Sequence, residues 1–248
     1  MSSSPERSRV RLDELLSRVR PEMVPLSQSF SYFSVTPLGS DEVHQYLEEP
    51  LAALPPALAA SLPRIEIVLA PFLERANGRG DYVCFERPPD HRQIPATRLV
   101  TPDAAALAFA IKEEDIADYH YAFYNAIAGL VRWEEQSPAR KAFTERIREE
   151  LRTEVHGEVD DKAWQRKQAL LRRPSAIAKE GKIFNEYVHQ AFEDTFTLYL
   201  HGICCDIDVE PGPRQMPSRH LRRRLELLAQ YFPPPAGYAV LPEQTRRR

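Results

Sequence analysis

The stretch RIEIVLAPFL (64–73), followed by ANGRGD (76–81) and YVCFE (82–86), contains the clearest β signal in the sequence. The first and last segments are rich in β-branched and aromatic residues, which favour strands. The middle segment contains Asn, Gly and Asp, which are typical of turns. We therefore predict an antiparallel hairpin with a loop longer than two residues.

Shorter signals surround this hairpin. SFSYFSV (29–35) alternates in part, and TRLV (97–100) could add a third strand. The leucines within residues 9–20 recur at helical spacing, which predicts a short amphipathic helix. Residues 50–63 are apolar but interrupted by prolines, so we expect short helical turns there.

From residue 101 onward the pattern is helical. Thr101 followed by Pro102 resembles a helix start, with a capping hydroxyl and a proline in the first turn. We therefore predict a helix from residue 102 to about 135, with apolar residues on one face. The same signals predict further helices, which begin near 138, 164, 175 and 218.

The predicted fold class is mostly α: an irregular multi-helix domain with a small antiparallel β-hairpin or three-stranded element in the N-terminal third. Prolines mark the helix junctions, which indicates stiff connections. We expect a single domain over 1–248. It would have an α/β portion over about 1–100, a helical portion over about 101–232, and an extended C-terminal tail over 233–248.

The composition narrows the class of protein. The chain has 248 residues, of which 43% are hydrophobic and 28% charged, as in ordinary globular domains. It contains no apolar run long enough for a membrane span and no secretory signal core. Three cysteines do not make a disulfide framework, so we expect a soluble, reduced, cytoplasmic protein. Only 9 glycines are present, and no nucleotide-binding or nucleophile-elbow motif was found.

The net charge is −3, but the charged residues are distributed unevenly along the chain. From Arg214 to the end, eight arginines face two acidic residues. In the predicted helix 218–232, Arg219, Arg222 and Arg223 lie away from the leucine stripe, and such a helix can bind an acidic protein or nucleic acid. The alternative is a packed helix whose arginines pair with the acidic remainder of the chain. Tyr121 and Tyr124, in the tyrosine-rich segment DYHYAFYN (118–125), are further candidates for partner binding.

Two clusters could bind a metal. Glu186, His189 and Glu193 would share one helix face, and Glu-x-x-His is the spacing of carboxylate-bridged di-metal sites. The second copy that such sites need is absent from the sequence, so a solvated helix face is the competing interpretation. The other candidate is His201 with Asp206 and Asp208, whose oxygens would suit Mg²⁺ or Ca²⁺.

Three functions remain open. The leading hypothesis is a non-catalytic protein-interaction or regulatory protein: an adaptor, a regulatory subunit or an immunity-type inhibitor that binds another protein. The first alternative is a metal-dependent enzyme with its carboxylate and histidine site within residues 175–210. The second is nucleic-acid binding through the Arg-rich helix. The sequence identifies no cofactor.

Overall fold

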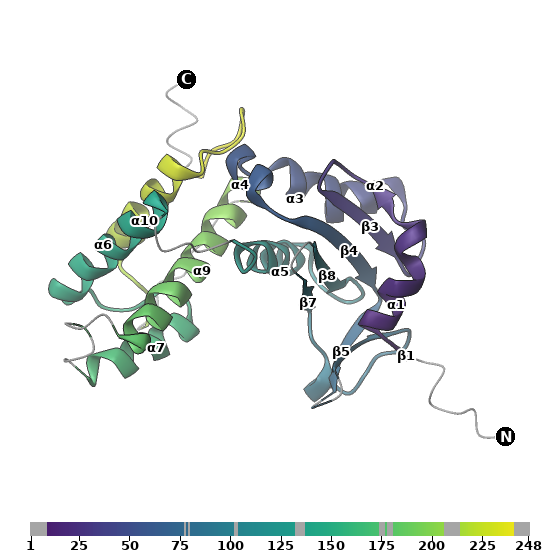
Figure 1. Cartoon of the computed structure of the whole chain (residues 1–248), viewed down its shortest axis with the longest axis horizontal. Coiled ribbons are helices and arrows are strands. Elements are labelled where there is room, and N and C mark those ends of the chain that lie inside the picture. The colour runs from purple at the N-terminus through teal and green to yellow at the C-terminus, as the bar shows by residue number, and fades with distance from the viewer. Residues whose placement is uncertain are drawn as a thin grey trace. The chain divides into compact units, whose positions relative to one another are not determined.

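A computed structural model describes residues 9–76, 78, 80–101, 104–131, 137–173, 177, 181–205 and 214–240. The chain divides into two compact units, whose elements are shown in Figure 1. Unit 1 comprises Met1–Ala52 and Ala59–Ala126, and unit 2 comprises Ala53–Leu58 and Ile127–Arg248.

Unit 1 is built around a mixed five-stranded sheet with the strand order β2-β3-β4-β8-β7. The central strands β3, β4 and β8 run parallel, and the edge strands β2 and β7 are antiparallel to their neighbours. Residues 65–70 of β4 are all buried, which explains their almost continuous apolar character. The strands are β2 (Val24–Pro25), β3 (Phe30–Ser34), β4 (Arg64–Ala70), β7 (Ala96–Val100) and β8 (Ala104–Ala110).

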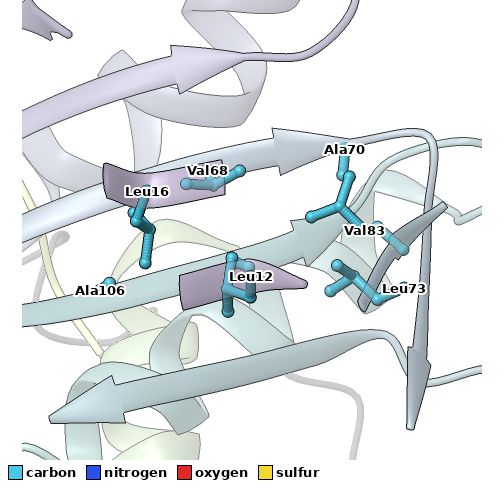
Figure 2. Close-up of a cluster of buried hydrophobic side chains, with 9 residues drawn as sticks. Leu12, Leu16, Val68, Ala70, Leu73, Val83 and Ala106 are labelled. Atoms are coloured by element: carbon cyan, nitrogen blue, oxygen red, sulfur yellow. The ribbon is translucent and has the colours of Figure 1, made fainter. Parts of the chain in front are cut away.

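A second, three-stranded antiparallel sheet and helix α1 (Leu12–Val19) pack on one face of this sheet. The small sheet has the order β1-β6-β5, formed by β1 (Arg9–Arg11), β5 (Phe72–Ala76) and β6 (Gly80–Cys84). Figure 2 shows the core between them, where Leu12 and Leu16 of α1 lie over Val68 and Ala106 of the large sheet. Small alanines on β8 leave room for the leucines of α1.

The opposite face of the large sheet is covered by aromatic side chains of helix α5 (Ile116–Ala128). Phe109 of β8 lies 5.3 Å from Tyr119 and 5.8 Å from Phe123, measured between ring centroids. The Tyr119 hydroxyl donates a hydrogen bond to the Tyr46 carbonyl at 2.7 Å, which joins α5 to the helical segment after β3. That segment and the remaining short helices are α2 (Ser40–Val43), η3 (His44–Glu48), α3 (Glu49–Ala52), α4 (Pro56–Ser61), η2 (Arg20–Glu22) and η4 (Asp90–Arg92).

Unit 2 is helical in its described part. Helix α9 is buried around most of its circumference, because α6, α7 and α10 all pack against it. Side chains cap two of these helices: Ser137 accepts from the Arg140 amide and Asp160 from the Lys162 amide. The helices are α6 (Pro138–Arg152), α7 (Asp161–Leu171), α9 (Lys182–Cys204) and α10 (Ser218–Tyr231). None of the described helices is long and apolar enough to cross a membrane.

The predicted fold class is wrong. Of the described residues 53% are helical and 20% are in strands, and the strands form two sheets of three and five strands rather than one small hairpin. The α/β part also extends beyond residue 100, because β8 and most of α5 belong to unit 1. Patterns within short stretches of sequence do not predict this sheet. Its central strands are parallel, and long crossover segments separate parallel strands along the chain.

Two predicted elements differ from the elements in the structure. The hairpin consists of β5 and β6 around residues 77–79, whereas β4 pairs with β3 and β8. The helix predicted over 102–135 is replaced by β8 and the shorter α5. AAALAFA (104–110) contains good helix formers, but burial in the centre of the sheet outweighs their intrinsic preference. Residues 102–103 and 132–136 lie outside the described part.

Other predicted elements are confirmed. Strands occur within 29–35 and 97–100, and helices cover most of 138–152, 164–171 and 218–232. Of the helix predicted to begin at Ser175, the structure describes the part from Lys182 onward. Residues 233–240 of the predicted tail contain neither helix nor strand, and residues 241–248 lie outside the described part.

Leu12→Ala should destabilise unit 1, because Leu12 is 2% exposed in the core between the two sheets. A buried leucine replaced by alanine loses about 2–5 kcal/mol of unfolding free energy. Urea titration followed by circular dichroism measures this loss. The matched control is Leu15→Ala, on the same helix but only partly buried. Equal losses for the two variants would contradict the assigned core.

Candidate functional site

Unit 2 contains a cluster of buried charges at its centre. Arg224 of α10 has no exposed surface, and Glu158, which precedes α7, is only 1% exposed. Glu150 of α6 and Lys167 of α7 are 1% and 3% exposed. Two cations and two carboxylates, all almost completely buried, therefore balance one another.

Arg224 binds both carboxylates. Its Nε donates to Glu150 Oε2 at 3.0 Å, and a terminal guanidinium nitrogen donates to Glu158 Oε2 at 2.8 Å. Lys167 Nζ donates to Glu158 Oε1 at 3.0 Å, and the Tyr187 hydroxyl of α9 donates to the same oxygen. Since these donors come from α7, α9 and α10, the Glu158 side chain connects the helices of unit 2.

The backbone around Glu158 is fixed as well. The Glu158 amide donates to the Arg214 carbonyl at 2.9 Å, and the Met216 amide donates to the Glu158 carbonyl at 3.1 Å. Gly157 has a φ of +73°, and a Cβ there would lie 2.3 Å from the Gln215 carbonyl oxygen. Only glycine fits this close approach of the two segments.

Electrostatics keep the cluster ionised. Burial by itself would raise the pKa of Glu158, but the charges of Arg224 and Lys167 outweigh burial and lower it. Burial likewise opposes the charge of Arg224, and the two carboxylates nevertheless raise the pKa of its guanidinium. Paired charges of this kind tolerate a low-dielectric interior, whereas an isolated charge does not.

A pocket of about 280 Å³ lies beside this cluster, between α6 and α10. Glu150 forms part of its wall and connects it to Arg224. The wall contains three arginines and two glutamates, and the Glu149 carboxylate is already paired with Arg146. We call it the α6–α10 pocket, and its lining residues are Arg146, Glu149, Glu150, Thr153, Arg219, His220 and Arg223.

His220 is 9% exposed in this wall. The Arg219 Nε–H donates to His220 Nε2 at 3.1 Å, so this ring nitrogen must be the unprotonated one. Burial lowers the pKa of His220; Glu150 opposes this, and nearby arginines including Arg219 and Arg223 lower it further. The ring is therefore neutral near pH 7, and its proton resides on Nδ1.

The arginines predicted to bind a partner fall into two groups. Arg222 is exposed and donates to Glu226 on its own helix at 3.2 Å. Arg219 and Arg223 are also exposed, but they line the pocket and form no ion pair with any residue that the structure describes. Two of the arginines that the sequence singled out thus line the α6–α10 pocket, and their role in binding stays a prediction.

The predicted metal ligands do not converge. Glu186 and His189 are exposed on α9, Glu193 is half-buried, and the three form no ligand cluster among the described residues. Lys182 Nζ lies 3.8 Å from a Glu186 carboxylate oxygen in an exposed ion pair. His201 is half-buried, while Asp206 and Asp208 lie outside the described residues. A metal at either site stays a prediction.

The two tyrosines proposed for partner binding differ in exposure. Tyr121 is half-buried in unit 1. Tyr124 is completely buried, and its hydroxyl donates to the Pro50 carbonyl at 3.1 Å. The Tyr124 ring therefore contributes to the core of unit 1 rather than to its surface.

Sequence reasoning missed the charged cluster, although a signal for it exists. Arg224 falls within the apolar stripe of Leu221, Leu225 and Leu228, at a helical core position. Glu150 likewise falls on the stripe of α6 that contains Phe143 and Ile147. A charged residue at a core position predicts a buried ion pair. Glu158 has no such signal, because it lies in a loop.

Arg224→Met should destabilise unit 2 strongly. The variant leaves two buried carboxylates with Lys167 as their remaining cation in the cluster, and breaking a buried ion pair in this way costs about 3–5 kcal/mol. Urea unfolding measures the loss. Arg223→Met is the matched control on the exposed side of the same helix. A loss no larger than that of this control would refute the structural role of the cluster.

A further buried carboxylate is not paired with a cation. Asp194 of α9 is 3% exposed; Gln190 donates to its Oδ1 at 2.8 Å, and its Oδ2 has no hydrogen-bond partner in the described structure. Burial raises the pKa of Asp194 to about 6, and the nearby Asp160 and Glu193 charges add to this effect. The folded chain therefore holds this proton more tightly than the unfolded chain does.

Asp194→Asn should consequently change the pH dependence of stability. Between about pH 4 and 6 the unfolded chain ionises first, so wild-type stability falls through this window and stays reduced above it. We expect the variant to gain about 3 kcal/mol relative to wild type at pH 7.5 but little at pH 4. Unfolding at both pH values tests this, with exposed Asp161→Asn as the control. A pH-independent difference would contradict it.

Comparison of the chain with protein-family models, with curated proteins and with solved structures found no match in any of the three. Its function must therefore be inferred from the geometry of the α6–α10 pocket and the charges around it.

Proposed function

We propose that the protein is a non-catalytic interaction protein that binds an acidic partner protein through the α6–α10 pocket. This function suits an adaptor, a regulatory subunit or an inhibitor of another protein. The observation that supports it best is the pair Arg219 and Arg223, which are exposed at the pocket without an ion-pair partner in the described structure. Arginine is favoured at interfaces because its guanidinium forms directional bonds to carboxylates and phosphates.

The charge distribution supports the same interpretation. Unit 1 contains 12 basic and 18 acidic residues, whereas unit 2 contains 21 basic and 18 acidic residues. The basic excess therefore belongs to the unit that contains the pocket. A positive surface of this kind accelerates the approach of a negatively charged partner.

The state of the lining groups favours binding over catalysis. Both carboxylates of the wall accept from arginines, Arg146 and Arg224. The Thr153 hydroxyl donates to the Glu149 carbonyl at 2.9 Å, and His220 Nε2 accepts from Arg219. A general base needs a free lone pair within reach of the substrate, and the His220 Nε2 lone pair is already engaged; a nucleophilic hydroxyl needs an adjacent base, whereas the described bonds of the Thr153 hydroxyl go only to backbone carbonyls.

A protein partner suits the pocket better than a nucleic acid. Nucleic-acid surfaces bind several successive phosphates and often stack bases on aromatic rings. Here Glu149 and Glu150 lie beside the arginines, and the lining contains no phenylalanine, tyrosine or tryptophan. One acidic group fits this arrangement, whereas a continuous phosphate backbone would meet the glutamates.

Fluorescence anisotropy with a labelled glutamate-rich peptide tests the proposal. Arg219→Gln combined with Arg223→Gln should weaken binding about tenfold or more, because two charge-assisted contacts are lost. Arg222→Gln removes the same charge from the neighbouring exposed site and should have a much smaller effect. A labelled DNA duplex of similar charge is the competing probe.

Two outcomes would overturn the proposal. One is wild-type protein that does not bind the glutamate peptide at low salt. The other is tighter binding to the duplex, which would favour the nucleic-acid function instead. Circular dichroism of each variant should match the wild type, since all three arginines are exposed.

A further inference from the structure

The α6–α10 pocket contains more hydrogen-bond donors than acceptors. The terminal nitrogens of Arg219 and the whole guanidinium of Arg223 donate to no described residue. His220 Nδ1 is protonated because Nε2 accepts from Arg219, and this Nδ1–H also has no acceptor in the described structure. Since the wall carboxylates are occupied by Arg146 and Arg224, the acceptors for these donors come from solvent or from an occupant of the pocket.

We propose that this occupant is a phosphoryl group on a side chain of the partner, as in phosphoserine or phosphothreonine, an inference that rests on the proposed function above. Arg219, His220 and Arg223 supply the recognition. A carboxylate has two oxygens in one plane, and a single arginine can satisfy both. A phosphate ester presents three terminal oxygens and up to two negative charges, which match several donors that approach from different directions.

The start of α10 provides additional donors. Pro217 caps this helix without a side-chain acceptor, and its first turn contains no acidic residue. The backbone amides of Ser218 and Arg219 have no acceptor in the described structure. Helix N-termini of this kind stabilise anions through their free N–H groups and their dipole. Arg219 and His220, which line the pocket, belong to this same turn.

The buried cluster prepares the pocket for this ligand. Arg219 and Arg223 are four residues apart and therefore occupy the same side of α10, while the bonds of Arg224 to Glu150 and Glu158 hold this helix in one rotational position. Arg224 also neutralises Glu150, which would otherwise repel a phosphate. A guanidinium held in place before binding loses less conformational entropy on binding.

Isothermal titration calorimetry of the full chain can test this inference with four probes. They are a short Gly-Ser peptide with one phosphoserine, the same peptide with serine, the same peptide with glutamate, and inorganic phosphate. We expect the phosphopeptide to bind about tenfold more tightly than the glutamate peptide, because it forms additional charge-assisted bonds. The serine peptide should not bind measurably. Arg219→Gln with Arg223→Gln should abolish the preference, and Arg222→Gln should preserve it.

The probes separate this inference from the proposed function. Equal binding of glutamate and phosphoserine peptides would overturn phosphoryl recognition and leave the acidic-partner proposal intact. If no peptide binds, both are overturned. If inorganic phosphate binds and the phosphopeptide does not, the pocket is a free-anion site and the inference is overturned.

His220 offers an independent readout. His220→Asn keeps an amide donor near the Nδ1 position, whereas His220→Leu removes it, so asparagine should preserve more of the phosphoserine preference. ¹⁵N NMR of the wild-type ring should show a protonated Nδ1 and an unprotonated Nε2, and the Nδ1 signal should shift on addition of the phosphopeptide. A protonated Nε2, or an Nδ1 signal that does not respond, would overturn the role of His220 even if the leucine variant does not fold.

Discussion

Arg224, held between Glu150 and Glu158 in the interior of unit 2, is the interaction on which the arrangement of its helices depends. Removing three charges from water is costly, and only their mutual hydrogen bonds offset that cost. Each member must therefore stay within bonding distance of the others. Because the cluster joins α6 and α10 directly, and α7 and α9 through Lys167 and Tyr187, it specifies how these helices register against one another.

This constraint also determines the chemistry of the pocket. With Arg224 fixed inside, the first two turns of α10 present Arg219, His220 and Arg223 along the α6–α10 pocket. Arg219 donates to the ring of His220, which selects the neutral tautomer with its proton on Nδ1. The interactions of Arg224 thus stabilise the interior of unit 2, while N–H donors of Arg219, His220 and Arg223 at the pocket have no acceptor in the described structure. The proposed ligand follows from that surplus rather than from a motif.

The sequence predicted the parts of the fold that local pattern determines. Helices of unit 2 follow their apolar stripes, and proline and capping signals place the start of α6. The five-stranded sheet could not be predicted in this way, because β4 and β8 are distant in sequence and pair in parallel. AAALAFA (104–110) is a strand only because strands and helices cover it on all sides. At the site, Arg219 and Arg223 could be singled out from the sequence because of their charge. Glu158 could not, because its burial depends on contacts with residues that are distant in the sequence.

Buried carboxylates elsewhere in the described chain differ from the arginines of the pocket in how their charge is compensated. In unit 1, Glu66 accepts from Arg20 and Arg64, and Glu74 accepts from Arg9 and Arg92. In unit 2, Asp194 lacks a cation, and burial raises its pKa so that it approaches neutrality instead. Buried acidic groups are thus either paired with cations or disposed to take up a proton. Arg219 and Arg223 are neither paired nor neutralised. No described carboxylate pairs with them, and a guanidinium does not lose its proton at physiological pH. Water can solvate them, but it does not explain why two such arginines meet a nearly buried histidine donor at one pocket. An anionic partner accounts for all three groups together.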